Sequence, residues 1–157
     1  MSVPTVVVGQ QLSGCCCVYH DDYHASYDLS SMMLEKGRKK LGYIGAVFQD
    51  KAVGEQRYKG FRDAVRDKGA EELAENYVIA AFTVSSGYEK AGELLEKCKD
   101  LDGIVCATDT MAAGAVKYLR ERGVKVPEQI MGHSLFFQAV QKTCSDDSFG
   151  ICGFHPP

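Results

Sequence analysis

Two hydrophobic periods alternate along most of this chain, and their alternation is the feature that most restricts its fold. Short apolar or β-branched runs, typical of strands buried on both faces, lie at residues 4–9, 14–19, 41–47, 76–80 and 103–107. Between them, apolar residues recur at helical spacing over residues 25–36, 54–68, 86–99 and 109–122. Strands that alternate with helices form a parallel sheet covered by helices on both faces. The sequence therefore predicts an α/β fold with a parallel sheet flanked by helices.

The ends of the expected helices are also marked in the sequence. Gly37, Gly69 and Gly123 stand where three of these helices should stop. After Ile130 the periodicity is lost, and residues 131–157 hold one apolar patch without a recognisable element.

Composition excludes several classes of protein. The 157 residues, of which 45% are apolar and 25% charged, suffice for one domain or for parts of two small lobes. No apolar run approaches the roughly 20 residues that cross a bilayer, and the start lacks the features of a secretory signal. The net charge of −3 gives no basic footprint of a nucleic-acid binder. Seven cysteines, three of them adjacent, fit no regular disulfide framework. We therefore expect a cytoplasmic protein with no membrane partner.

The three adjacent cysteines precede two histidines and two aspartates, which raises the question of a metal site. Zinc sites usually pair their cysteines as Cys-x-x-Cys, whereas consecutive strand residues point to alternate faces, so at most Cys15 and Cys17 could share an ion. The alternative is a buried strand that leads into a helix, with Asp21 and Asp22 placed to cap its N-terminus. We favour the strand and cap, and predict no metal site.

Motifs for catalysis are incomplete. Gly9 and Gly14 have the spacing of a phosphate loop, but cysteines stand where lysine and serine or threonine are needed. Cys152 and His155 could form a nucleophile–base pair, yet nothing supplies an orienting partner or an oxyanion hole. We predict no catalytic residue, no cofactor and no enzymatic activity.

Two polar residues stand where a ligand of an open parallel sheet is expected, beyond the carboxyl ends of the strands. Asp109 directly follows the strand at 103–107, where it could accept hydrogen bonds from ligand hydroxyls or simply cap the next helix. Arg57 lies early in a helix after the loop that follows the strand at 41–47. Its guanidinium could donate toward the same crevice, or lie on a solvated helix face.

Several short segments, in their order and spacing, carry a family resemblance across about residues 4–130. They are Gly37-Arg38-Lys39-Lys40-Leu41-Gly42-Tyr43-Ile44-Gly45, Arg57-x-x-Gly60-Phe61, Phe82 with Ser86-Gly87-Tyr88, Asp109-x-Met111-Ala112-x-Gly114-Ala115, and Gly123-x-x-Val126-Pro127-x-x-Ile130. Together they resemble the LacI/GalR family of transcription regulators. The ligand-sensing core of that family has the fold of type I periplasmic binding proteins, in which each lobe is flavodoxin-like.

The resemblance implies a fold, a ligand and a set of site residues. Two lobes would close on a small effector, usually a sugar, with Arg57 and Asp109 as polar ligands, Phe82 as an apolar wall and Asp21 as an acidic residue near the cleft. The alternative from a different functional class is a solute-binding protein of a sugar transporter, which has the same fold.

Only part of the family's architecture corresponds to this sequence. We expect residues 1–39 to be a remnant of the first lobe and the crossover, residues 40–131 the second lobe, and residues 132–157 a divergent tail. The family's helix-turn-helix head is not in the sequence. We expect DNA binding to require such a head, and we do not expect this chain to bind DNA by itself. We also expect a homodimer, with the small-residue faces of the helices at 86–99 and 109–122 as candidate subunit contacts.

Overall fold

The computed structural model of the chain describes residues 4–9, 11–71 and 75–134. Its body is a parallel four-stranded sheet with the strand order β4-β3-β5-β6. The strands are β3 (Leu41–Gly45), β4 (Tyr77–Ile79), β5 (Gly103–Cys106) and β6 (Met131–Ser134). In β3 and β5 every residue is buried, as expected for strands covered on both faces. The predicted parallel α/β fold is confirmed.

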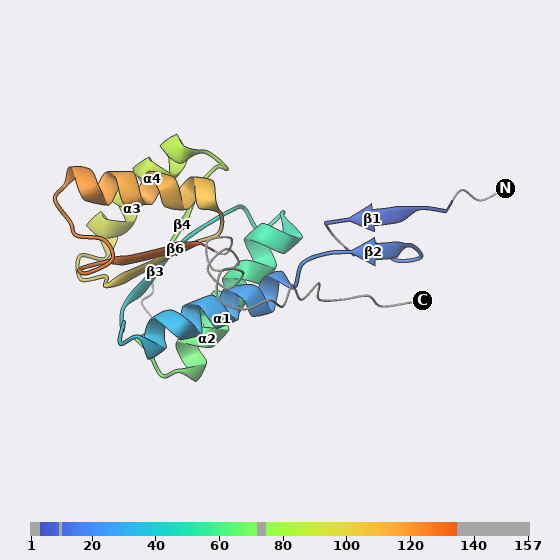
Figure 1. Ribbon diagram of the computed structural model, residues 1–157, viewed down its shortest axis with the longest axis horizontal. Helices are drawn as coiled ribbons and strands as arrows, with labels where there is room; N and C mark the ends of the chain where they lie inside the picture. The colour runs from blue at the N-terminus through green and yellow to red at the C-terminus, as the bar shows by residue number, and fades with distance from the viewer. Residues whose placement is uncertain (1–3, 10, 72–74, 135–157) are drawn as a thin grey trace, which may run out of the picture.

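Two pairs of helices cover the sheet, one pair on each face (Figure 1). On one face lie α1 (Asp22–Glu35) and α2 (Arg57–Asp67); on the other lie α3 (Val84–Lys97) and α4 (Asp109–Glu121). Leu29 and Met33 of α1 share one hydrophobic core with the buried strands β3 and β5. Helix α1 is therefore part of the same body as the sheet.

The helix ends follow the predicted chemistry. The side chain of Asp21 caps α1 by accepting a hydrogen bond from the backbone N–H of His24, at 3.1 Å. Gly37, Gly69 and Gly123, which follow the last turns of α1, α2 and α4, have φ angles of 90°, 65° and 72°. This left-handed backbone favours glycine and stops a helix.

A π-helical turn, η1 (Lys51–Gln56), leads directly into α2. Asp50 caps this turn, because its carboxylate accepts from the N–H of Val53 at 2.8 Å. A Cβ atom on Gly54 would lie 2.0 Å from the carbonyl oxygen of Val47, so the turn can fold back on the end of β3 only with glycine here. Such wide turns are frequent at functional sites.

Small residues bring the helices of each pair into close contact. A Cβ on Gly60 of α2 would lie 2.2 Å from the carbonyl oxygen of Tyr23 in α1. Likewise, a Cβ on Gly114 of α4 would lie 2.1 Å from the carbonyl of Val84 in α3, and one on Gly87 would meet the backbone of Met111. The glycines of α3 and α4 thus pack these helices on each other, and are not available for the subunit contacts expected from the sequence.

The first two strands, β1 (Val6–Val8) and β2 (Cys16–Val18), form a separate parallel pair. We call this pair the ribbon; it stands apart from the body (Figure 1). The strands exist as predicted, but the prediction that they are buried on both faces is wrong for the described structure. Val6 and Val8 are 60% and 77% exposed, since no second layer covers the ribbon in the described residues.

Strand β6 was not predicted, because Met131-Gly132-His133-Ser134 lacks a run of apolar or β-branched residues. Tertiary pairing places it beside β5, with Gly103 opposite Met131 and Cys106 opposite Ser134. Among the helices of the described segments, none is long and apolar enough to cross a membrane.

Candidate functional site

The carboxyl ends of all four parallel strands lie at one edge of the sheet, which we call the carboxyl edge. Arg57 reaches this edge from the start of α2. One of its terminal nitrogens, Nη1, donates to the carbonyl oxygen of Ala107, directly after β5. Its Nε donates to the Oδ1 atom of Asp22 at 2.7 Å, and Nη2 lies 2.7 Å from the same oxygen. Arg57 therefore joins the starts of α1 and α2 to the end of β5.

The two neighbouring aspartates at the start of α1 have different roles. Asp21 is exposed and acts as the helix cap. Burial raises its pKa, but the hydrogen bonds from the His24 backbone and ring together outweigh this effect and leave that pKa below its usual value. Asp22, in the first turn, is buried and holds Arg57. The sequence singled out Asp21 as the acidic residue of the cleft, whereas the contact with Arg57 belongs to Asp22. The position of Asp22 in the sequence, one residue after the predicted cap Asp21, is the signal that could have identified Asp22 as a site residue.

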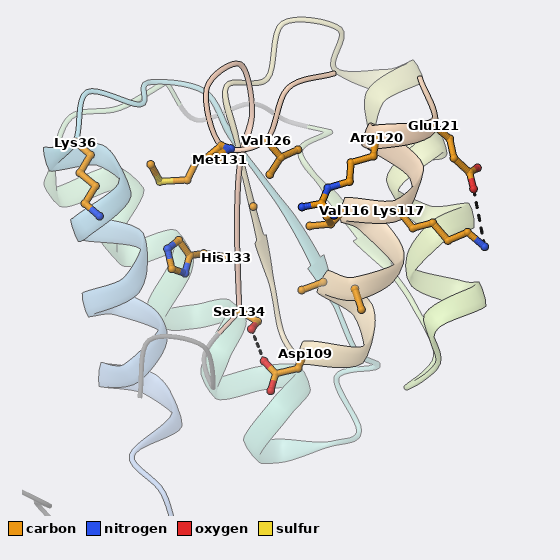
Figure 2. Close-up of a pocket in the computed structure, with 14 residues that line it drawn as sticks. Lys36, Asp109, Val116, Lys117, Arg120, Glu121, Val126, Met131, His133 and Ser134 are labelled. Atoms are coloured by element: carbon orange, nitrogen blue, oxygen red, sulfur yellow. Dashed lines mark hydrogen bonds and ion pairs between the residues drawn. The ribbon is translucent and has the colours of Figure 1, made fainter. Parts of the chain in front are cut away.

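Asp109 lies in the first turn of α4, two residues after the carbonyl that Arg57 contacts. Thr108, not Asp109, caps this helix by accepting from the N–H of Met111 at 3.4 Å. The carboxylate of Asp109 instead accepts a hydrogen bond from the hydroxyl of Ser134, at the end of β6 (Figure 2). Ser134 could not be found from the sequence, because its strand was not predicted. Arg57 and Asp109 thus come from different helices to the same edge.

Aromatic side chains follow two of the strands at this edge. Phe82 comes after β4 and is 49% exposed. Phe48 comes after β3, is 42% exposed, and stacks on the ring of Tyr77 with centroids 5.5 Å apart. The rule that selected Asp109, a residue just beyond a predicted strand, would also have selected Phe48. Both rings offer exposed apolar surface.

A groove of about 840 Å³ lies along β6, between Lys36 at the end of α1 and helix α4 (Figure 2). Asp109 and Ser134 line one end of this groove, and Val116 and Met131 line its middle. Arg57, Phe82 and Asp21 are not among its lining residues. The groove thus meets the carboxyl edge at Asp109 and Ser134 but does not include Arg57, and we place the candidate site at the carboxyl edge, where Arg57 and Asp109 both lie.

The cysteines in the described segments are free. Cys15, just before β2, and Cys16, in β2, are exposed, whereas burial in the sheet raises the pKa of the Cys106 thiol to about 12. Across residues 4–9, 11–71 and 75–134, no three cysteine, histidine or acidic side chains are arranged to hold a metal ion. Cys152 and His155, considered from the sequence as a nucleophile and base, lie outside the described residues.

Comparison with known proteins places this arrangement in a family. Residues 31–132 match the model of the periplasmic binding protein-like domain. The HTH-type transcriptional regulator IdnR of Escherichia coli is 37% identical over 111 residues, which cover 70% of this chain and 32% of that protein. The chain spans about a third of the length of the curated relatives it matches.

Solved structures agree with the sequence relatives. A sugar-binding transcriptional regulator of the LacI family from Escherichia coli, complexed with phosphate, superposes with a TM-score of 0.78 at 26% identity, over 83% of this chain and 48% of that one. The transcriptional regulator CelR in complex with cellobiose has a TM-score of 0.73 at 29% identity, over 82% of this chain and 40% of the other. This chain therefore belongs to the periplasmic binding protein-like domain family, in the form found in the effector-binding region of LacI-family transcription regulators.

Proposed function

We propose that this chain is the second lobe of the sugar-sensing core of a LacI-family transcription regulator. The observation that carries the proposal is that Arg57 and Asp109 both lie at the carboxyl edge of one parallel sheet, where ligands of open α/β sheets bind. The cellobiose complex of CelR supports a saccharide as the effector.

Each residue of the site has a role that suits a polyhydroxyl ligand. Asp109 would accept hydrogen bonds from sugar hydroxyls, and the N–H groups of Arg57 that do not contact Asp22 or Ala107 would donate to sugar oxygens. Phe82 and Phe48 would cover the apolar faces of a sugar ring. Asp21 would lie at the rim of the crevice, at the start of α1.

The packing of α1 supports a lobe boundary earlier in the chain than residue 39. Because α1 packs on α2 and contributes to the core of the body, we place the crossover at residues 19–21, between the ribbon and α1. In this proposal the ribbon belongs to a first lobe, and closure of the two lobes on a sugar shifts the population of the closed state.

The assembly that would convey this shift is a cytoplasmic homodimer that binds DNA through helix-turn-helix heads. Sedimentation velocity on the chain tests the dimer. A single species at twice the chain mass supports it, and a monomer at all concentrations up to the solubility limit contradicts it.

A thermal melt with a panel of mono- and disaccharides tests the site. A sugar present at about 100 times its Kd should add about 2.7 kcal/mol to the apparent stability. We expect Arg57→Ala and Asp109→Ala to abolish the shift that the effector gives. Arg66→Ala is the matched control, because Arg66 lies on the same helix as Arg57 and its side chain is 62% exposed. If the sugar still raises the melting temperature of both site variants, the assignment of these residues to the site is wrong.

A further inference from the structure

The charge of Arg57 is already neutralised inside the protein. Two of its nitrogens lie 2.7 Å from one carboxylate oxygen of Asp22, and the third contacts the carbonyl of Ala107. The side chains of Arg57 and Asp22 are only 18% and 9% exposed, so little water screens their attraction. Arg57 can therefore donate N–H hydrogen bonds to a ligand, but it presents little net positive charge to that ligand.

The starts of the helices at the carboxyl edge are also supplied with negative charge. A helix N-terminus is normally a place where a phosphate or carboxylate binds. Here the chain's own carboxylates occupy the helix starts: Asp21 and Asp22 on α1, Asp50 on η1 and Asp109 on α4. α3 begins at the uncharged cap Thr83, and α2, which continues η1, begins after Gln56 with no acidic residue in its first turn.

In the part of the chain that the structure describes, the starts of α1, η1 and α4 therefore carry negative charge. Two lysines flank Arg57 in the sequence: Lys51 of η1 pairs with Glu55 at 2.6 Å, and the Nζ of Lys59 lies 5.3 Å from the centroid of the Tyr23 ring. An anionic ligand group beside Arg57 would approach the carboxylate of Asp109 while the guanidinium is already paired with Asp22, and such like-charge contacts exclude a ligand more strongly than a lost hydrogen bond does. An uncharged hydroxyl can instead donate to a carboxylate and accept from a guanidinium.

We propose that the site selects uncharged saccharides over phosphorylated or carboxylated ones, and that Asp22 sets this selection by neutralising Arg57. This inference rests on the proposed sugar-sensing function and adds the chemical class of the sugar. Asp22 acts as a specificity-determining residue through Arg57, without needing to touch the ligand.

Isothermal titration calorimetry on the whole chain tests the selection with matched pairs of probes. Glucose, fructose, cellobiose and sucrose are compared with the corresponding 6-phosphates, with gluconate and with inorganic phosphate. For the neutral sugar that binds, we expect its phosphate ester to bind about tenfold or more weakly. Asp22→Asn keeps the shape of the side chain and a hydrogen-bond acceptor for Arg57, but removes the charge. It should reduce the ratio of the two affinities by about tenfold.

Two further measurements separate charge selection from a structural role of Asp22. Asp28→Asn, a change at an exposed position of the same helix, should leave the ratio of affinities unchanged. In the wild-type chain, raising the salt concentration from about 20 mM to about 0.5 M should also reduce the ratio, because salt screens the repulsion. If Asp22→Asn does not fold, this salt dependence decides the matter.

The outcomes distinguish the two proposals. A phosphate ester or gluconate that binds as tightly as the neutral sugar overturns the charge selection alone. So does an affinity ratio that is unchanged both in Asp22→Asn and at high salt. A wild-type chain that binds neither class of probe overturns the sugar-sensing function and, with it, the selection.

Discussion

At the scale of single residues, the position of one cap decides which aspartate can reach Arg57. The carboxylate of Asp21 accepts from the N–H of His24, which fixes α1 to begin at Asp22. Asp22 then lies in the first turn, buried against α2, while Asp21 stays exposed. Local sequence rules predict the cap. They do not predict the ion pair, because Asp22 and Arg57 are 35 residues apart and meet only through the packing of α1 on α2.

The pair between Asp22 and Arg57 should contribute to stability. Asp22→Ala leaves a largely buried guanidinium without its carboxylate, which we expect to lower the free energy of unfolding by about 3 kcal/mol. Chemical denaturation monitored by circular dichroism measures the loss. Asp28→Ala, at an exposed position of α1, should change stability by less than about 0.5 kcal/mol. Equal effects of the two changes would show that the pair contributes nothing specific.

Glu93 should make the stability of the body depend on acid pH. Hydrogen bonds from Lys90 and then Lys97 lower the pKa of Glu93 from 4.5 to about 2. A carboxyl group whose pKa is lower in the folded state than in the unfolded state stabilises the folded protein fully at pH values above its unfolded-state pKa. This stabilisation disappears as the pH falls from about 4.5 toward 2.

The Glu93→Gln variant should therefore show a flatter loss of stability across this window than the wild-type chain. Thermal melts from pH 5 to pH 2 give the slope, and Glu96→Gln, exposed on the same helix, should keep the wild-type slope. The prediction fails if Glu93→Gln and the wild-type chain lose stability in parallel.

At the scale of helices and strands, the sequence predicts what is encoded locally. The helix expected at 109–122 is observed as Asp109–Glu121, and the strand expected at 103–107 as Gly103–Cys106. The helix expected at 54–68 is instead the π-helical turn η1 followed by α2, because Gly54 packs on the backbone of Val47 in the preceding loop, a contact that helical periodicity does not encode. For the same reason β6 was missed: its residues become a strand through pairing with β5.

The close contact of α1 and α2 gives a prediction at this scale. Gly60→Ala places a methyl group 2.2 Å from the carbonyl oxygen of Tyr23, so the two helices must separate. We expect a loss of about 1–3 kcal/mol, as for other overpacked positions. Urea unfolding measures it, with Gly132→Ala as control, because a Cβ there meets Val116 at an ordinary 3.5 Å. A Gly60→Ala variant as stable as Gly132→Ala would contradict the packing described for this helix pair.

At the scale of the whole molecule, the ribbon and the body differ in what supports them. The strands of the body are covered by helices on both faces, whereas the valines of the ribbon are exposed and two strands alone are rarely stable. The sequence predicts buried strands at the ribbon because β-branched runs usually have a second layer. Whether such a layer exists is decided by parts of a fold that a local pattern does not contain.

Hydrogen exchange should reveal this difference directly. We expect amides of β1 and β2 to exchange at least about a thousandfold faster than those of β3 and β5, which open only when the body unfolds. Mass spectrometry of peptic peptides that cover residues 4–18, 41–45 and 103–106 provides the comparison. Equal protection of the three segments would mean that the ribbon is as firmly held as the sheet.

The strand order β4-β3-β5-β6 also has a consequence in time. A chain synthesised from its N-terminus makes β3 first among these strands, yet β3 lies inside the sheet and pairs with β4 on one side and β5 on the other. Until residues 103–106 leave the ribosome, a nascent chain therefore carries a strand with apolar faces whose backbone N–H and C=O groups on one edge are still unpaired. The sheet grows outward from its oldest strand, and the interval between the emergence of β3 and that of β5 is when a chaperone has most to protect.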